Sequence, residues 1–175
     1  MSRHRGRTLK LALLGAALLV VGVAGSAFAG PPWISIEYPA NPFDAASRNA
    51  FLIVHSYHHQ TQIAAELVGT AEGLVGSTRR SVRLRFDSTS RTGVYALRKQ
   101  WPAGGTWMLV ISTSSHEGMG ATALVDLAAD GGISAVRVPT TMREGWAIPK
   151  VVTAAEIDAA LRRRASSELA TRGER

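Results

Sequence analysis

The sequence predicts an all-β fold, an antiparallel β-sandwich of about seven or eight strands followed by a C-terminal α-helix. Three observations carry this prediction. Short stretches of alternating apolar and polar residues recur at spacings of about 8–14 residues, as in sandwich domains. Turn-forming Gly, Pro and Asp residues separate these stretches. The gaps show no crossover helix of roughly ten or more residues, which parallel strands would need.

The stretches that we expect to form strands are, in chain order, residues 33–38, 50–59, 61–71, 81–87, 93–101, 106–113, 121–127 and 132–138. The alternation is clearest in 81–87, where Val82, Leu84 and Phe86 share one face and two arginines share the other. This pattern is typical of a sheet with one solvated face. An Asp-Gly pair at Asp130 predicts a hairpin turn between the last two strands.

Aromatic side chains are expected to fill much of the core. Tyr95, Trp101 and Trp107 fall at inward positions on either side of the Pro-Ala-Gly-Gly turn. Trp146 lies outside the clear strands and near Pro149. We expect it to cap the sandwich, with an exposed contact residue as the alternative.

The C-terminal part changes character. Thr153 and Glu156 have the spacing of a capping box, and Ile157 and Leu161 form a narrow apolar stripe. These signals predict a helix over 153–170 that docks at most through its first half. The arginine run 162–164 lies late in this helix, where positive charge complements the helix dipole.

The first 29 residues have the three parts of a secretory signal peptide. A basic start is followed by an uncharged apolar run over 11–29, which ends in Ala27-Phe28-Ala29. We expect cleavage after Ala29 and export by the general secretory route to the periplasm or the outside of the cell. An uncleaved membrane anchor is the alternative, because nineteen residues are just enough to span a bilayer. The expected organisation is a signal peptide over 1–29, a sandwich over 30–149, and a helix with a basic tail over 150–175.

The net charge of +7 suggests a nucleic-acid partner, but its distribution argues against one. The signal segment contributes four positive charges, the tail 162–175 contributes a net three, and the body over 30–161 is neutral. A neutral body lacks the basic footprint of a nucleic-acid binder. Membrane contact is therefore expected only through the signal segment or, weakly, through the basic C-terminal helix.

No convergent catalytic set emerges, and we expect a protein that is not an enzyme. The chain has no cysteine, which excludes disulfides, thiolate metal sites and a cysteine nucleophile. No G-x-S-x-G elbow is present, and adjacency of Ser115 and His116 does not make a catalytic dyad. Glu66 and Glu72 are the only candidates for paired carboxylates, and we expect both on the surface.

Histidine and methionine are the candidate metal ligands. His55 and His59 are expected on one strand face with Tyr57 between them, and His58 on the other. His116 and Met119 belong to a predicted loop. Imidazole and thioether suit copper, so His55, His58, His59, His116 and Met119 form a candidate copper site. Solvated or packed histidines are the alternative, since residues i and i+4 lie about 13 Å apart along a strand.

Residues 93–111 read GVYALRKQWPAGGTWMLVI, a G-x-Y pattern and an apolar strand followed by G-x-W and another apolar strand. This segment resembles the end of the YtkA-like family of small exported β-sandwich domains. It is also similar to transthyretin-type and carboxypeptidase-regulatory-like domains. The resemblance covers 63–113 and implies an immunoglobulin-like or prealbumin-like sandwich. Some YtkA-like proteins are linked to copper handling or to membrane-bound partners. The dense Met/His motifs that would strengthen a copper role are absent here, and His116 and Met119 remain.

Together these observations favour an exported, non-enzymatic binding or accessory module with a protein or small-molecule partner that the sequence does not name. No cofactor is expected in this interpretation. A periplasmic copper-binding protein and a signal-anchored subunit of a membrane complex are the alternatives.

Overall fold

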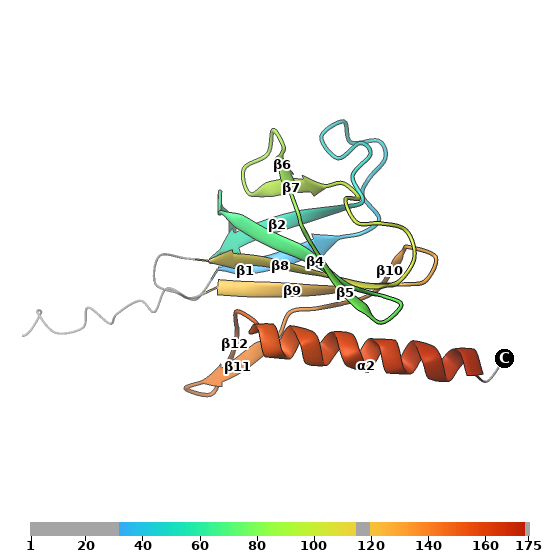
Figure 1. Cartoon of the computed structure of the whole chain (residues 1–175). Coiled ribbons are helices and arrows are strands. Elements are labelled where there is room, and N and C mark those ends of the chain that lie inside the picture. Colours follow the sequence, from blue (N-terminus) through green and yellow to red (C-terminus); the bar gives the residue numbers. More distant parts are fainter. Residues whose placement is uncertain (1–31, 115–119, 174–175) are drawn as a thin grey trace, which may run out of the picture.

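The computed structural model describes residues 32–114 and 120–173. Two antiparallel sheets pack face to face, and the C-terminal helix lies on the far side of the second sheet (Figure 1). The predicted antiparallel β-sandwich with a C-terminal helix is confirmed. The predicted signal peptide over 1–29, His116 and Met119 lie outside the described residues.

Sheet A is the upper sheet in Figure 1 and sheet B the lower one. Sheet A has the order β1-β2-β7-β6, with β3 paired to β2, and contains β1 (Trp33–Glu37), β2 (Leu52–His58), β3 (Thr61–Gln62), β6 (Phe86–Ser88) and β7 (Val94–Leu97). Sheet B has the order β10-β9-β8-β4-β5 and contains β4 (Leu67–Val75), β5 (Thr78–Arg83), β8 (Thr106–Ser114), β9 (Gly120–Leu127) and β10 (Ile133–Arg137).

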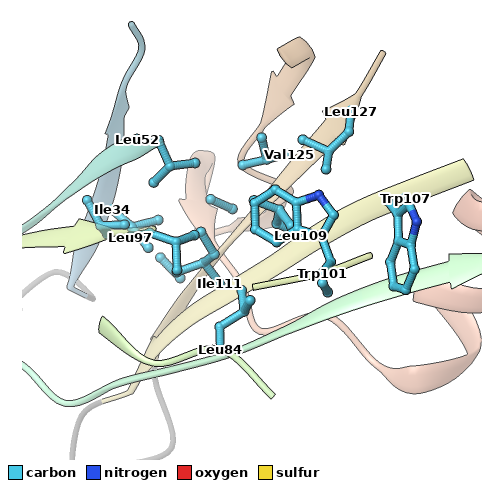
Figure 2. Close-up of a cluster of buried hydrophobic side chains, with 14 residues drawn as sticks. Ile34, Leu52, Leu84, Leu97, Trp101, Trp107, Leu109, Ile111, Val125 and Leu127 are labelled. Carbon is cyan, nitrogen blue, oxygen red and sulfur yellow. The ribbon is translucent and has the colours of Figure 1, made fainter. Parts of the chain in front are cut away.

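The main core lies between the two sheets, where alternate residues of each strand point inward. Sheet A contributes Ile34, Leu52 and Leu97, and sheet B contributes Leu109 and Ile111, all with no exposed surface. Figure 2 shows these side chains together with the two core tryptophans. Trp101 and Trp107 are buried, and the half-buried Tyr95 packs against the same cluster, as the sequence predicts.

The predicted strand 81–87 is two strands in different sheets. β5 ends at Arg83 in sheet B and β6 begins at Phe86 in sheet A, so the chain crosses between the sheets at Leu84. The backbone N–H of Leu84 donates to the Gly69 carbonyl at 2.9 Å. The apolar alternation continues through the crossing because both flanking strands face the same core.

The predicted strand 61–71 also changes sheet, from β3 to β4. The phenol of Tyr95 fixes the crossing, because its hydroxyl accepts from the Ala65 N–H at 3.0 Å and donates to the Ala65 carbonyl at 2.8 Å. Gly93 lies under this segment with φ +72°, and a Cβ there would come within 2.6 Å of the Ile63 carbonyl oxygen. Only glycine fits such a position without strain.

A hairpin that the sequence analysis missed follows sheet B. It consists of β11 (Thr140–Arg143) and β12 (Trp146–Pro149), which pair only with each other in the described part of the chain. Glu144 and Gly145 both have positive φ at its tip, as two-residue hairpin turns require. Trp146 is 76% exposed on this hairpin, so the expectation that it caps the sandwich is wrong.

Helix α2 (Ala154–Gly173) forms a third layer. Ala160 and Leu161 are buried against Met108, Val110 and Leu124, which point away from the core between the sheets. The predicted capping box is confirmed, since the Thr153 N–H donates to Glu156 Oε2 at 2.9 Å and the Glu156 N–H donates to Thr153 Oγ1 at 3.3 Å. In the described residues no helix is long and apolar enough to span a membrane.

Two ionic clusters fasten α2 to sheet B. Arg79 on β5 bridges Glu72 on β4, at 2.7 Å, and Asp158 on α2, at 2.9 Å. Asp126 on β9 pairs with Arg137 on β10 at 2.9 Å and with Arg164 on α2 at 3.5 Å. Glu72 is only 8% exposed, so the expectation that it lies on the surface is wrong. Buried carboxylates are tolerated because arginines pair with them.

Replacement of Leu161 by alanine tests the docking of the helix. Leu161→Ala should lower the free energy of unfolding by about 2–5 kcal/mol, because Leu161 is 1% exposed and its removal leaves a cavity under α2. Arg162→Ala, at the exposed neighbouring position, should change it by about 0.5 kcal/mol or less. Urea unfolding followed by circular dichroism measures both, and equal stabilities of the two variants would contradict the docking.

The capping carboxylate gives a pH prediction. Hydrogen bonds from the Lys150 ammonium, and then from the Thr153 backbone and hydroxyl, lower the pKa of Glu156 from 4.5 to about 2. Because the pKa is lower in the folded state, this stabilisation is complete above pH 4.5 and is lost as the pH falls toward 2. NMR titration of the Glu156 carboxyl carbon measures the pKa. Lys150→Met should raise it toward 4.5, since it removes the largest cause. A pKa near 4.5 in the unmodified protein would contradict this assignment.

Candidate functional site on the outer face of sheet A

The outer face of sheet A is covered over one half. Ile53, Val94 and Ala96 point away from the main core, yet they are buried because Ala40 and Ala50 pack over them. These alanines belong to the connection between β1 and β2. An ion pair between Asp44 and Arg91, at 2.8 Å, ties this connection to the segment before β7. The connection therefore covers that half of the outer face of sheet A.

The other half of this face carries polar and aromatic side chains. On β1, Ile34 points into the core, so the residues that alternate with it point outward. The register places Trp33 opposite Tyr57 and Ser35 opposite His55. The side chains that share this half of the face are Trp33, Ser35, Glu37, His55, Tyr57 and Gln62, which we call the Trp33 patch.

A chain of hydrogen bonds runs through the centre of the Trp33 patch. His55 Nε2 lies 2.9 Å from Glu37 Oε2, and His55 Nδ1 lies 3.1 Å from Gln62 Nε2. Gln62 Nε2 also donates to the Tyr57 hydroxyl at 3.5 Å. The rings of His55 and Tyr57 are nearly parallel, at 20°, with centroids 6.2 Å apart. These contacts hold four planar polar groups in fixed positions on the sheet.

Exposure within the Trp33 patch is graded. The His55 side chain is 13% exposed and the Glu37 side chain is 38% exposed. Trp33, at the start of β1, is 44% exposed. The patch therefore offers solvent one open indole and one accessible carboxylate beside a fixed imidazole.

The structure does not assemble the predicted copper ligands around His55. Both ring nitrogens of His55 already have partners, Glu37 and Gln62, and neither is a predicted ligand. His58 and His59 lie at the end of β2, with ring centroids 4.3 Å apart, and His59 has a positive φ of 48°. Among residues 32–114 and 120–173, no group of three or more His, Cys, Asp or Glu could hold a metal ion. The copper site stays a prediction, since His116 and Met119 lie outside these ranges.

The remaining carboxylate candidates do not form a catalytic pair. Glu66 is exposed, whereas Glu72 is buried and bonded to Arg79 at 2.7 Å and to the Ser81 hydroxyl at 2.9 Å. A carboxylate held by an arginine and a hydroxyl serves the packing of sheet B and α2. Sequence reasoning identified His55 and Tyr57 on one strand face but missed Glu37 and Gln62. Only the pairing of β1 and β3 with β2 brings these two side chains to His55.

Comparison with known proteins adds no identification. No protein family matches the chain, and no match is found among curated proteins or solved structures. The resemblance of residues 93–111 to YtkA-like domains therefore stays a prediction that rests on the sequence pattern.

The hydrogen bonds of His55 predict its tautomer. The amide nitrogen of Gln62 can only donate, so Nδ1 accepts and the proton of neutral His55 lies on Nε2, which donates to Glu37. Long-range ¹H–¹⁵N correlation at a pH where the imidazole is neutral should show a protonated Nε2 and a bare Nδ1. Gln62→Leu, which removes the donor, should bring the Nδ1–H tautomer into the spectrum. A dominant Nδ1–H form in the unmodified protein would contradict the arrangement.

Proposed function

We propose that this chain is an exported, non-enzymatic binding module that takes its ligand on the Trp33 patch. The observation that carries the proposal is the 44% exposure of Trp33 beside the fixed Glu37–His55–Gln62 chain. An open aromatic ring next to prearranged polar groups provides both contact area and directional hydrogen bonds. The sequence of the first 29 residues supports export to the periplasm or the outside of the cell.

His55, Glu72 and Asp126 are placed for hydrogen bonding and packing rather than for proton transfer. A general base needs a free site that can take a proton from a substrate. His55 has both ring nitrogens engaged, and Glu72 and Asp126 are paired with arginines under α2. In the Trp33 patch, the hydrogen bonds of His55 therefore hold side chains in fixed positions at the surface of the sandwich.

A ligand panel tests the proposed function. The exported protein is titrated with neutral oligosaccharides and with short peptides, and the amide NMR spectrum is recorded. We expect at least one ligand class to shift the amides of 33–37, 55–57 and 62 in a saturable way, with the ligand recovered unchanged. Chemical-shift changes confined to other regions, such as the hairpin of β11 and β12, would overturn the Trp33 patch as the site.

Export is tested on the same sample. N-terminal sequencing should find a chain that begins at Gly30. A chain that keeps residues 11–29 would instead support an anchored subunit of a membrane complex. Binding of Cu(II) at the histidines without any change at Trp33 would support the copper-binding alternative.

A further inference from the structure

We infer that the ligand of the Trp33 patch is a carbohydrate, a neutral oligosaccharide or polysaccharide chain. This inference rests on the proposed function, because it names the ligand class of the same surface.

The shape of the patch is set by adjacent strands. Strands β1, β2 and β3 lie side by side, with neighbouring strands about 4.8 Å apart. From Trp33 to Glu37 the patch spans about 13 Å along β1, at about 3.4 Å per residue. The result is an elongated sheet surface whose length matches a short run of sugar rings. A small-molecule site would instead be concave and enclose most of its ligand.

The aromatic groups suit the apolar side of a sugar ring. A pyranose presents axial C–H bonds on its faces, and these stack on the electron-rich face of an indole or phenol. Trp33 is 44% exposed, and the half-buried Tyr57 lies directly opposite it across the β1–β2 pair. The register therefore places both aromatic residues at one end of the patch, and the polar groups lie along the rest of it.

The polar groups suit the sugar hydroxyls. Each hydroxyl donates one hydrogen bond and accepts others, so neighbouring hydroxyls are best met by planar groups that carry paired donors or acceptors. Carboxylate and amide are such groups, and Glu37 and Gln62 supply one of each, with His55 bonded between them to hold them in place. The carboxylate of Glu37 has acceptor capacity beyond its bond to His55, and its side chain is 38% exposed.

The rigidity of the Trp33 patch favours tight capture of a ligand, and its charge disfavours anionic ligands. The hydrogen-bonded chain fixes these side chains before binding, which lowers the entropy lost when a ligand is captured. The Trp33 patch contains the carboxylate of Glu37 and no lysine or arginine, so it disfavours phosphate and carboxylate ligands. A neutral, hydroxyl-rich ligand fits a surface with this composition.

The test uses the exported protein and four neutral hexasaccharides: cellohexaose, xylohexaose, maltohexaose and N-acetylchitohexaose. We expect at least one of them to bind with a millimolar or lower Kd and to shift the indole N–H signal of Trp33. Trp33→Ala should weaken that binding about tenfold or more, since it removes the stacking surface. Trp146→Ala is the matched control. It removes a tryptophan that is 76% exposed on the hairpin, and it should leave the Kd unchanged.

Gln62→Ala provides a second variant that keeps both aromatic side chains, Trp33 and Tyr57. It should weaken binding several-fold, because it removes one polar group and releases His55. The inference is overturned if none of the four sugars binds, or if Trp33→Ala binds as tightly as the unmodified protein. Peptide binding at the patch, for example by strand addition at the edge strand β1, would overturn the carbohydrate class and uphold the proposed function. No ligand at the patch from any class would overturn both.

Discussion

Met108, Val110 and Leu124 point away from the sandwich core, yet all three are buried because α2 lies over them. The central strands of sheet B are thereby covered on both faces, and every residue of β9 is buried. A two-sheet sandwich normally leaves the outer face of each sheet to solvent. Here the helix covers the outer face of sheet B, whereas the outer face of sheet A stays partly open.

The buried charges follow from this layering. The register aligns Glu72, Met108 and Asp126 in one row across β4, β8 and β9, so two carboxylates flank the methionine beneath the helix. Each needs a cation because its burial removes water. Arg79, on the edge strand β5, pairs with Glu72 and also with Asp158 of the helix. Arg164, on the helix, pairs with Asp126 on the other side of the row. Some of the charged residues of the body therefore serve to form the ion pairs that hold α2 on sheet B.

Local signals in the sequence predicted the elements that depend on local physics. Alternation identified the strands and the inward tryptophans, and the Thr153–Glu156 spacing identified the helix start. Alternation cannot reveal a change of sheet, because the residues on both sides of Leu84 face the same core. Nor can it reveal which strands pair. Glu37 and Gln62 meet His55 only through pairings with β2, eighteen and seven residues apart along the chain. The hairpin shows no alternation, since β12 (WAIP) is apolar at every position and β11 (TTMR) is mostly polar, so it carries no such signal.

Only part of the outer face of sheet A is covered, and the side chains under the cover differ in polarity from those outside it. Where Ala40 and Ala50 pack, the outward residues are the apolar Ile53, Val94 and Ala96. Where this cover ends, the same strands carry His55 and Tyr57, and β1 carries Glu37. An uncovered sheet face needs only solvated polar residues to remain stable. The hydrogen-bonded side chains of Glu37, His55 and Gln62 and the exposed indole of Trp33 are more than stability requires, since an exposed tryptophan contributes little to folding. The proposed binding function would account for this excess.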